Sequence, residues 1–430
     1  MSTRELPQER TWVACVGDFA ILKEYLAQKK QPVWRIVQFL HTFLCGFGQI
    51  VFSNNPISGL LLIITLAVVT PGTLALSAST AGLGLLLSVV CFNINYKPLG
   101  VKHRPFLPEK IIQEPQVIVE NGLSVFNPLL VGAVSYSLIP QIYGAFDIFS
   151  VPLVLLAAVL SVYLARSLRS DKFSCTAWPF NLVEYMLIFV LLGQNRANVL
   201  TESAKQMFER HNATSETMTT TMTTMSDAGF YKRNASDVYI NWGKVFRGSV
   251  VSASQLFFID DVIVGCVMYL AMIIYSPVTT AFSFFGALCG TVTGLELGAD
   301  YGEVYSGLWG YNSLLTGAAL GGNLLILNGQ TAIATVLAII YTSLLQYSLR
   351  SIFMKMQLPV LTLPFVIAIS LFLKLSGGKN DPTFPWPVSI TFPEKARHDY
   401  LARRTVFRAD NTPEELELVI QKPKDSTQDS

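Results

Sequence analysis

The sequence predicts an all-α membrane protein: an inverted repeat of two five-helix halves, each with re-entrant or broken half-helices around a central pore. Three observations support this fold class. Of 430 residues, 51% are hydrophobic and 14% are charged, and the mean hydropathy is +0.44, whereas soluble domains carry about 25% charged residues. Apolar runs of bilayer-spanning length recur along the chain. Two sets of motifs repeat at fixed offsets.

The apolar runs form two groups separated by a polar stretch. The first group covers about 36–53, 57–77, 79–95, 124–145, 147–167 and 177–194, and the second about 248–259, 262–280, 279–299, 307–327, 330–349 and 358–376. The expected organisation is a cytoplasmic N-terminal segment, a first transmembrane repeat, an extracellular loop, a second transmembrane repeat and a cytoplasmic tail. These five regions are 1–35, 36–194, 195–247, 248–376 and 377–430.

Basic residues indicate which loops face the cytoplasm. They gather in 23–35, 97–110 and 166–172. If all three are cytoplasmic and one of the first three apolar runs is re-entrant, the first half crosses the membrane five times. The 195–247 loop is then extracellular, where its sequons at Asn212 and Asn234 predict N-glycosylation. The same scheme places Arg350 and Lys355 outside, against the usual rule. The polar N-terminus predicts no cleavable signal peptide.

Internal similarity relates the two halves. Residues 122–132 match 307–317, and 174–180 match 359–365, both at an offset of 185, while Gln49 matches Gln255 at an offset of 206. A single insertion, placed in 96–121, accounts for the difference. Two copies with an odd number of spans have opposite orientations, which places a solute path at the repeat interface near the bilayer midplane.

Helix-breaking residues occur at corresponding places. Pro179 and Pro364 interrupt apolar segments, and Asn54-Asn55-Pro56 follows a short apolar run. A broken helix exposes backbone groups that lipid would penalise by several kcal/mol each, so they must face protein or a wet path. Symmetry-related breaks favour a pore over ordinary proline kinks.

Three segments resemble the urea transporter family over about 40–376. They are Leu358-Pro359-Val360-Leu361-Thr362-Leu363-Pro364-Phe365, Gly307-Leu308-Trp309-Gly310-Tyr311-Asn312-Ser313, and the segment 48–59 from Gly48-Gln49 to Ser58-Gly59. The resemblance implies passive, channel-like urea transport at the plasma membrane. It also implies a homotrimer in which each subunit has its own pore in the lipid bilayer.

The resemblance also implies roles for individual residues. Gln49 and Gln255 would be a pseudo-symmetric polar pair at two dehydration sites, Phe52 and Phe258 would be walls of the slot, and Thr362 would supply a hydroxyl in the narrow region. In the first half, Ala177 stands where the family has the matching threonine, with Thr176 one position earlier. A one-residue shift rotates a helical side chain by roughly 100°. Further departures are Phe173-Ser174 for Leu-Pro and Asp261-Val262 for Asn-Pro.

These residue types suit a planar, neutral solute with four N–H donors and one carbonyl acceptor. Losing its water without replacement hydrogen bonds would cost urea several kcal/mol, and carbonyls, Gln49, Gln255 and Thr362 can replace that water stepwise with weak sites. Structural roles are the alternative: Gln49 bonding a neighbouring helix, Phe52 and Phe258 packing in the core, and Thr362 capping a helix.

Other chemistry receives little support. Intramembrane acids can mark ion coupling, but no basic residue lies close in sequence to complete a relay with Glu184, Asp260, Asp261 or Glu296. Asp260 and Asp261 are therefore expected at a pore mouth or helix start. The six scattered cysteines show no metal-ligand spacing, so no metal or cofactor is expected. A net charge of +2 without a basic stripe predicts no nucleic-acid partner.

Alternative functions remain open. Ala177 leaves room for a channel for another small neutral solute (ammonia, water or a small amide) or for a paralogue with altered selectivity. An enzyme would need clustered carboxylates, a Ser/His pair or a metal motif. None is visible, so the sequence predicts no enzyme. A receptor or scaffold would not need paired broken helices.

Overall fold

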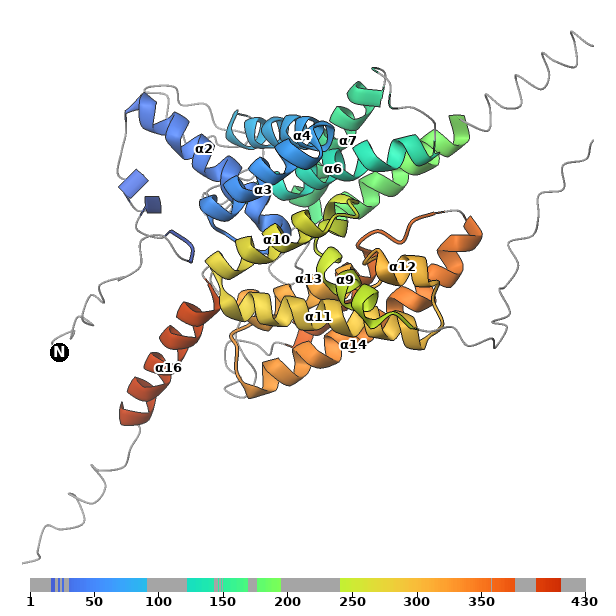
Figure 1. Cartoon of the computed structure of the whole chain (residues 1–430). Coiled ribbons are helices and arrows are strands. Elements are labelled where there is room, and N and C mark those ends of the chain that lie inside the picture. Colours follow the sequence, from blue (N-terminus) through green and yellow to red (C-terminus); the bar gives the residue numbers. More distant parts are fainter. Residues whose placement is uncertain are drawn as a thin grey trace, which may run out of the picture.

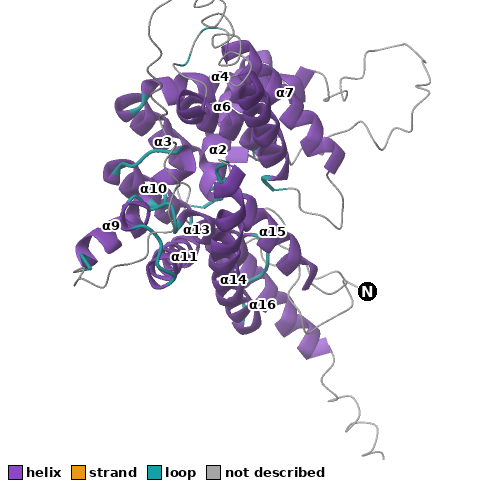
Figure 2. Ribbon diagram, turned by 90° about the vertical axis from the view of Figure 1, so that its right-hand side faces the viewer, coloured by secondary structure: helices purple, strands orange, loops and turns teal. Residues whose placement is uncertain are grey.

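The computed structural model describes residues 17–19, 22–23, 25–26, 31–90, 122–142, 146, 148, 150–168, 176–194, 240–356, 358–375 and 392–410. Within these ranges the chain is helical with connecting loops and no β-strand (Figure 2). The fold is that of a helical membrane protein. Predicted glycosylation at Asn212 and Asn234 lies outside the described residues.

The first repeat consists of helices that follow one another closely, several of them starting at a proline. In chain order they are α2 (Pro32–Gly48), η1 (Gln49–Val51), α3 (Pro56–Val69), α4 (Pro71–Val90), α6 (Leu123–Ile142), α7 (Ser150–Leu168) and a helix over Trp178–Gln194.

The second repeat follows the same order. Its elements are α9 (Trp242–Val251), η2 (Ser254–Phe257), α10 (Val262–Tyr275), α11 (Pro277–Glu296), α12 (Tyr301–Tyr305), α13 (Tyr311–Ala318), η3 (Ala319–Asn323), α14 (Gly329–Phe353), η4 (Met354–Met356), α15 (Leu363–Phe372) and η5 (Leu373–Leu375). Helix α9 already begins at Trp242, ahead of the position 248 expected for this repeat, because Asn241 caps it by accepting from the Lys244 N–H at 3.1 Å.

Element lengths and backbone angles confirm the internal repeat. Helices α3 and α10 both have 14 residues and α4 and α11 both have 20, each pair at the sequence offset of 206. The breaks before α3 and α10 also correspond, because Phe52 and Phe258 have left-handed φ values of 58° and 59°. This conformation is rare for residues other than glycine, so its occurrence at matched positions shows that the helix is interrupted in the same way in both repeats.

The first break in each half has a local cause. The segment Val33–Val51 meets Pro56–Val69 at an angle of 79°. Asn55 begins α3 by accepting from the Ile57 and Ser58 N–H groups, and Pro56 follows at the first helical turn. In the second half Asp261 caps α10 by accepting from Val264 N–H at 2.9 Å. The expectation that Asp261 sits at a helix start is therefore confirmed.

The second break follows the same logic. Thr176 and Leu361 have positive φ values of 24° and 51°, again at the offset of 185. Pro179 and Pro364 occupy the first turn of the helices that follow, where a missing N–H has no cost. Both prolines therefore begin half-helices after a reversal of the backbone, as the sequence predicts, rather than kinking a continuous helix.

The two repeats pack against each other through α3 and α10, which lie side by side at their boundary (Figure 1). The Ser58 hydroxyl on α3 donates to the Ala271 carbonyl on α10 at 2.7 Å. Within the described residues, five helices are long and apolar enough to cross a membrane, or up to six if the bent α2–α3 pair is one span. Shorter apolar helices at Trp178–Gln194, Val262–Tyr275 and Leu363–Leu375 accompany them.

Segments near both ends of the chain contact the membrane helices. The Asn55 amide, at the start of α3, donates to the Gly17 carbonyl at 2.9 Å. The range 377–430, expected as a polar tail, contains helix α16 (Pro393–Asp410). Glu394 on α16 accepts from the Ser276 hydroxyl at 2.9 Å and from the Val278 N–H at 3.1 Å, so α16 caps the start of α11.

Candidate functional site

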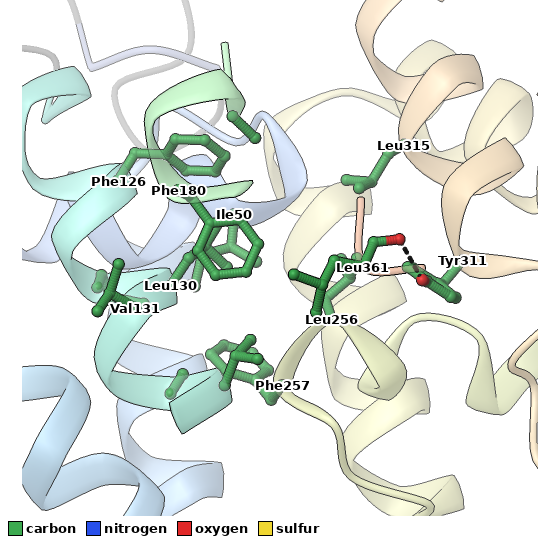
Figure 3. Close-up of a cluster of buried hydrophobic side chains, with 14 of the residues drawn as sticks. Ile50, Phe126, Leu130, Val131, Phe180, Leu256, Phe257, Tyr311, Leu315 and Leu361 are labelled. Carbon is green, nitrogen blue, oxygen red and sulfur yellow. Dashed lines mark hydrogen bonds between the residues drawn. The ribbon is translucent and has the colours of Figure 1, made fainter. Parts of the chain in front are cut away.

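A narrow cavity of about 20 Å³ lies between the two repeats, which is space for about one water molecule. Both repeats line it, as Figure 3 shows for Phe126, Leu130 and Phe180 facing Leu256, Leu315 and Leu361. Its lining residues are Ile50, Phe126, Leu130, Val134, Ala177, Phe180, Gln255, Leu256, Phe258, Tyr311, Leu315, Leu361 and Thr362.

The second repeat supplies every polar side chain of this lining: Gln255, Tyr311 and Thr362. The first repeat contributes only apolar ones. Two of the differences fall at symmetry-related positions, since Phe126 corresponds to Tyr311 and Ala177 to Thr362 at the offset of 185. The cavity therefore has one apolar wall and one wall carrying hydrogen-bonding groups.

Gln255 is held in place by the backbone. It lies in η2, directly before the left-handed Phe258, and its amide nitrogen donates to the Ser306 carbonyl at 2.7 Å. Only 6% of the residue is exposed. The bond to Ser306 fixes the direction of the amide group, and Phe258 borders the same cavity.

Thr362 lies at the start of α15 and is 7% exposed. It occupies the N-cap position, but its side chain makes no capping hydrogen bond. Instead the Thr362 hydroxyl accepts from the side-chain amide of Asn181, which belongs to the other repeat, at 2.8 Å. A role in helix capping is therefore excluded, and the hydroxyl belongs to the repeat interface.

The other predicted pore residues lie outside this lining. Gln49 is 6% exposed and so faces protein rather than lipid. Phe52 packs edge-on against Phe365 with ring centroids 6.1 Å apart. Since Phe365 corresponds to Phe180 at the offset of 185, this is the mirrored counterpart of the Phe258 and Phe180 pair that borders the cavity.

Thr176 takes a different place from Ala177. Ala177 borders the cavity and Thr176 does not. The Thr176 hydroxyl is buried without a hydrogen-bond partner, and its carbonyl accepts from the Asn127 amide at 3.2 Å. The backbone at Thr176 is left-handed, and Thr176 does not take the place of Ala177 in this lining.

Sequence reasoning overlooked the residues that brace the broken helices. Asn127 donates to the Thr176 carbonyl, and its counterpart Asn312 donates to the Leu361 carbonyl at 3.1 Å. The Tyr311 hydroxyl donates to the same Leu361 carbonyl (Figure 3). The two asparagines stood at matching places in the repeated motif, which is the signal that could have identified them.

The acidic residues have local partners. Asp260 pairs with Arg247 at 2.9 Å on the exposed side, and Ser135 donates to the buried Glu184 carboxylate at 3.1 Å. Glu303 pairs with Arg350, which accounts for one of the two basic residues that the predicted topology places outside. No group of three or more His, Cys, Asp or Glu side chains suited to a metal ion occurs in the parts of the chain that the structure describes.

Comparison with known proteins agrees with this architecture. The family model described as urea transporter matches residues 40–377. The chain belongs to the urea transporter family. "Urea transporter 1" of Ovis aries is 26% identical over 406 residues, covering 94% of this chain and 93% of the relative. "Urea transporter 1" of Capra hircus has the same identity and coverage, and that of Rattus norvegicus is 25% identical over 394 residues, covering 90% and 89%.

Membership of the urea transporter family confirms the resemblance found in the sequence and the extent expected for it. It makes the chain a multi-pass membrane protein of a family of transport proteins. The family model also covers both broken helices in each half, so the cavity at the repeat interface lies wholly within the matched region.

Proposed function

We propose that this protein carries urea passively down its gradient, through a pore that runs between the two repeats of each subunit. The observation that carries the proposal is the cavity lined by Gln255, Phe258 and Thr362 on one side and by apolar side chains of the first repeat on the other. Family membership and the names of the relatives support urea as the solute.

The chemistry of the lining suits urea. Phe258 and Phe180 offer flat apolar surfaces to a planar molecule, and Gln255 and Thr362 offer hydrogen bonds in place of water. No charged side chain is among the lining residues, so an ion would lose its hydration without compensation and is rejected. The weakness of single neutral hydrogen bonds, about 1 kcal/mol net each, allows the solute to leave as easily as it enters.

Pseudo-symmetry extends the path beyond this cavity. Gln49, Phe52 and Phe365 correspond to Gln255, Phe258 and Phe180, and Phe52 contacts Phe365. The proposal assigns these three residues to the mirrored end of the path. Urea would meet a glutamine and a pair of aromatic rings on entering from either side. The narrow middle would be bordered by Ala177 and Thr362.

The proposal includes the assembly and location that the family resemblance implies. The subunit would form a homotrimer with one pore in each copy, in the plasma membrane, with membrane lipid around it. Exposed apolar side chains on several helices, such as Ile263 and Ile333, which are each 65% exposed in the single chain, are consistent with lipid or neighbouring subunits at those faces.

The test is urea flux with purified full-length protein in liposomes, measured by stopped-flow light scattering. Wild type should raise urea permeability well above that of empty liposomes. Gln255→Leu and Thr362→Val should each lower it by roughly three- to ten-fold, the effect of losing one net hydrogen bond. Gln141→Leu provides a matched control, because Gln141 is exposed at the end of α6 and does not line the cavity.

Three results would contradict the proposal in whole or in part. Wild-type liposomes that are no more permeable to urea than empty ones would remove the function, and transport of a small amide without urea would favour the alternative solute. Equal losses in Gln141→Leu and Gln255→Leu would remove the site assignment while leaving transport intact.

A further inference from the structure

The side chain of Asn181 connects the two repeats by a hydrogen bond to Thr362, which lines the cavity. Asn181 lies in the first turns of the Trp178–Gln194 helix and is 1% exposed. Its amide nitrogen lies 2.8 Å from the Ala177 carbonyl oxygen and 2.8 Å from the Thr362 hydroxyl oxygen. One nitrogen therefore contacts an acceptor from each repeat.

Counting donors fixes the direction of these bonds. A carbonyl oxygen can only accept, so the atom facing Ala177 must be the NH₂ group of Asn181 and not its oxygen. An amide NH₂ has two hydrogens, one for the Ala177 carbonyl and one for Thr362. Thr362 is therefore the acceptor in this pair, and its own hydroxyl hydrogen is left to be donated elsewhere.

The cavity is where that hydrogen can be used. Among the residues that the structure describes, the Thr362 hydroxyl has no acceptor within hydrogen-bonding geometry, and Thr362 lines the cavity. Tyr311, the other hydroxyl in the lining, already donates to the Leu361 carbonyl and can offer only its oxygen. The two hydroxyls of this wall thus have opposite roles.

We propose that Asn181 is a positioning residue that holds the Thr362 hydroxyl as a hydrogen-bond donor toward the pore, so that the narrow region selects solutes with a strong acceptor such as a carbonyl oxygen. This inference rests on the proposed transport function and adds the specificity of its central step. Asn181 itself is not in the cavity lining and acts through Thr362.

The pair formed by Asn181 and the Thr362 hydroxyl has no polar counterpart at the symmetry-related positions. At the offset of 185, Thr362 corresponds to Ala177 and Asn181 corresponds to Val366. Both members of the mirrored pair are therefore apolar, and the second repeat alone carries the donor. A solute passing the middle is held by its acceptor against α15, while its remaining surface meets apolar side chains such as Phe180 and Leu130.

Removing Asn181 should release this donor. Without the Asn181 amide, the Thr362 hydroxyl loses the hydrogen bond that fixes its orientation.

The experiment compares urea with thiourea, which has the same N–H donors but a weaker acceptor, in liposomes containing full-length protein. Wild type should carry urea faster than thiourea. Asn181→Val should lower urea permeability by about three- to ten-fold and thiourea permeability by less, so the urea-to-thiourea ratio falls. Thr362→Val should lower the ratio equally, the double variant should add nothing, and Thr362→Ser should keep the wild-type ratio.

Asn181→Val should fold, because valine occupies the corresponding position 366 and the Ala177 carbonyl keeps the Asn181 backbone N–H at 3.1 Å. Asn181→Ala serves as a second variant, and monodisperse elution is required of each. A wild-type ratio in both Asn181 variants, beside a lowered ratio in Thr362→Val, would overturn the positioning role alone. Absence of urea flux in wild type would overturn the proposed function and this inference together.

Discussion

The apolar pair at Ala177 and Val366 provides a sharp test of the pseudo-symmetry. In the mirrored location, Asn181 and Thr362 are joined by a hydrogen bond of 2.8 Å across the repeat interface. The double substitution Ala177→Thr with Val366→Asn should recreate this bond. The new amide should also reach the carbonyl of Thr362, four residues earlier, as Asn181 reaches that of Ala177.

The magnitudes follow from burial. Ala177 is 1% exposed and Val366 is fully buried, so each single substitution adds a polar group without its partner and should cost about 1–3 kcal/mol of folding free energy. The double variant pairs the two groups, regains about 1 kcal/mol of hydrogen bonding and removes part of both desolvation costs. The expected coupling energy is therefore about 1–3 kcal/mol, in the range found for contacting residues.

Equilibrium unfolding in mixed micelles, followed by tryptophan fluorescence, would measure this cycle. Val154→Asn combined with Ala177→Thr is the matched control, because Val154 on α7 is equally buried but is not the symmetry counterpart of Asn181. The two control substitutions should change the free energy of unfolding additively. Additivity within about 0.5 kcal/mol for the Ala177 and Val366 pair would refute the argument that the two positions mirror Asn181 and Thr362.

Three further outcomes are expected. Tyr311→Phe should cost only about 1 kcal/mol in the same unfolding assay, since Asn312 still holds the Leu361 carbonyl; a loss of folded protein would contradict this. Glu394→Ala should speed hydrogen exchange at the start of α11, because Ser276 and Val278 lose their acceptor, and unchanged exchange would mean that α16 does not cap α11. Finally, dissipating sodium and proton gradients should leave urea uptake unchanged, and collapse of uptake would reveal ion coupling.

The sequence predicted those features that depend on neighbouring residues. Pro179 and Pro364 remove a backbone donor and cannot lie inside a helix without cost, so the start of a half-helix at each could be read directly. The repeat offsets predicted that Phe52 and Phe258 would share a role, and their matched left-handed conformation agrees.

Features that depend on distant residues were not predictable in the same way. The structure decides which of Thr176 and Ala177 lines the cavity, and it is Ala177. The left-handed backbone at Thr176 could not be predicted from the sequence alignment of the two halves. Helix α16 was missed because its residues are polar, and it is fixed by a contact between Glu394 and Ser276. Its stability arises from docking rather than from an apolar face of its own.

The amino-acid order alone thus determined the membrane class, the two copies and the positions where helices break, because apolar length, proline and internal similarity act locally along the chain. Only the tertiary structure decided which polar groups meet. Asn181 and Thr362 are 181 residues apart, and no local rule relates them. Their bond exists because two halves pack face to face, and that packing leaves hydrogen-bonding side chains on one wall of the cavity and apolar ones on the other.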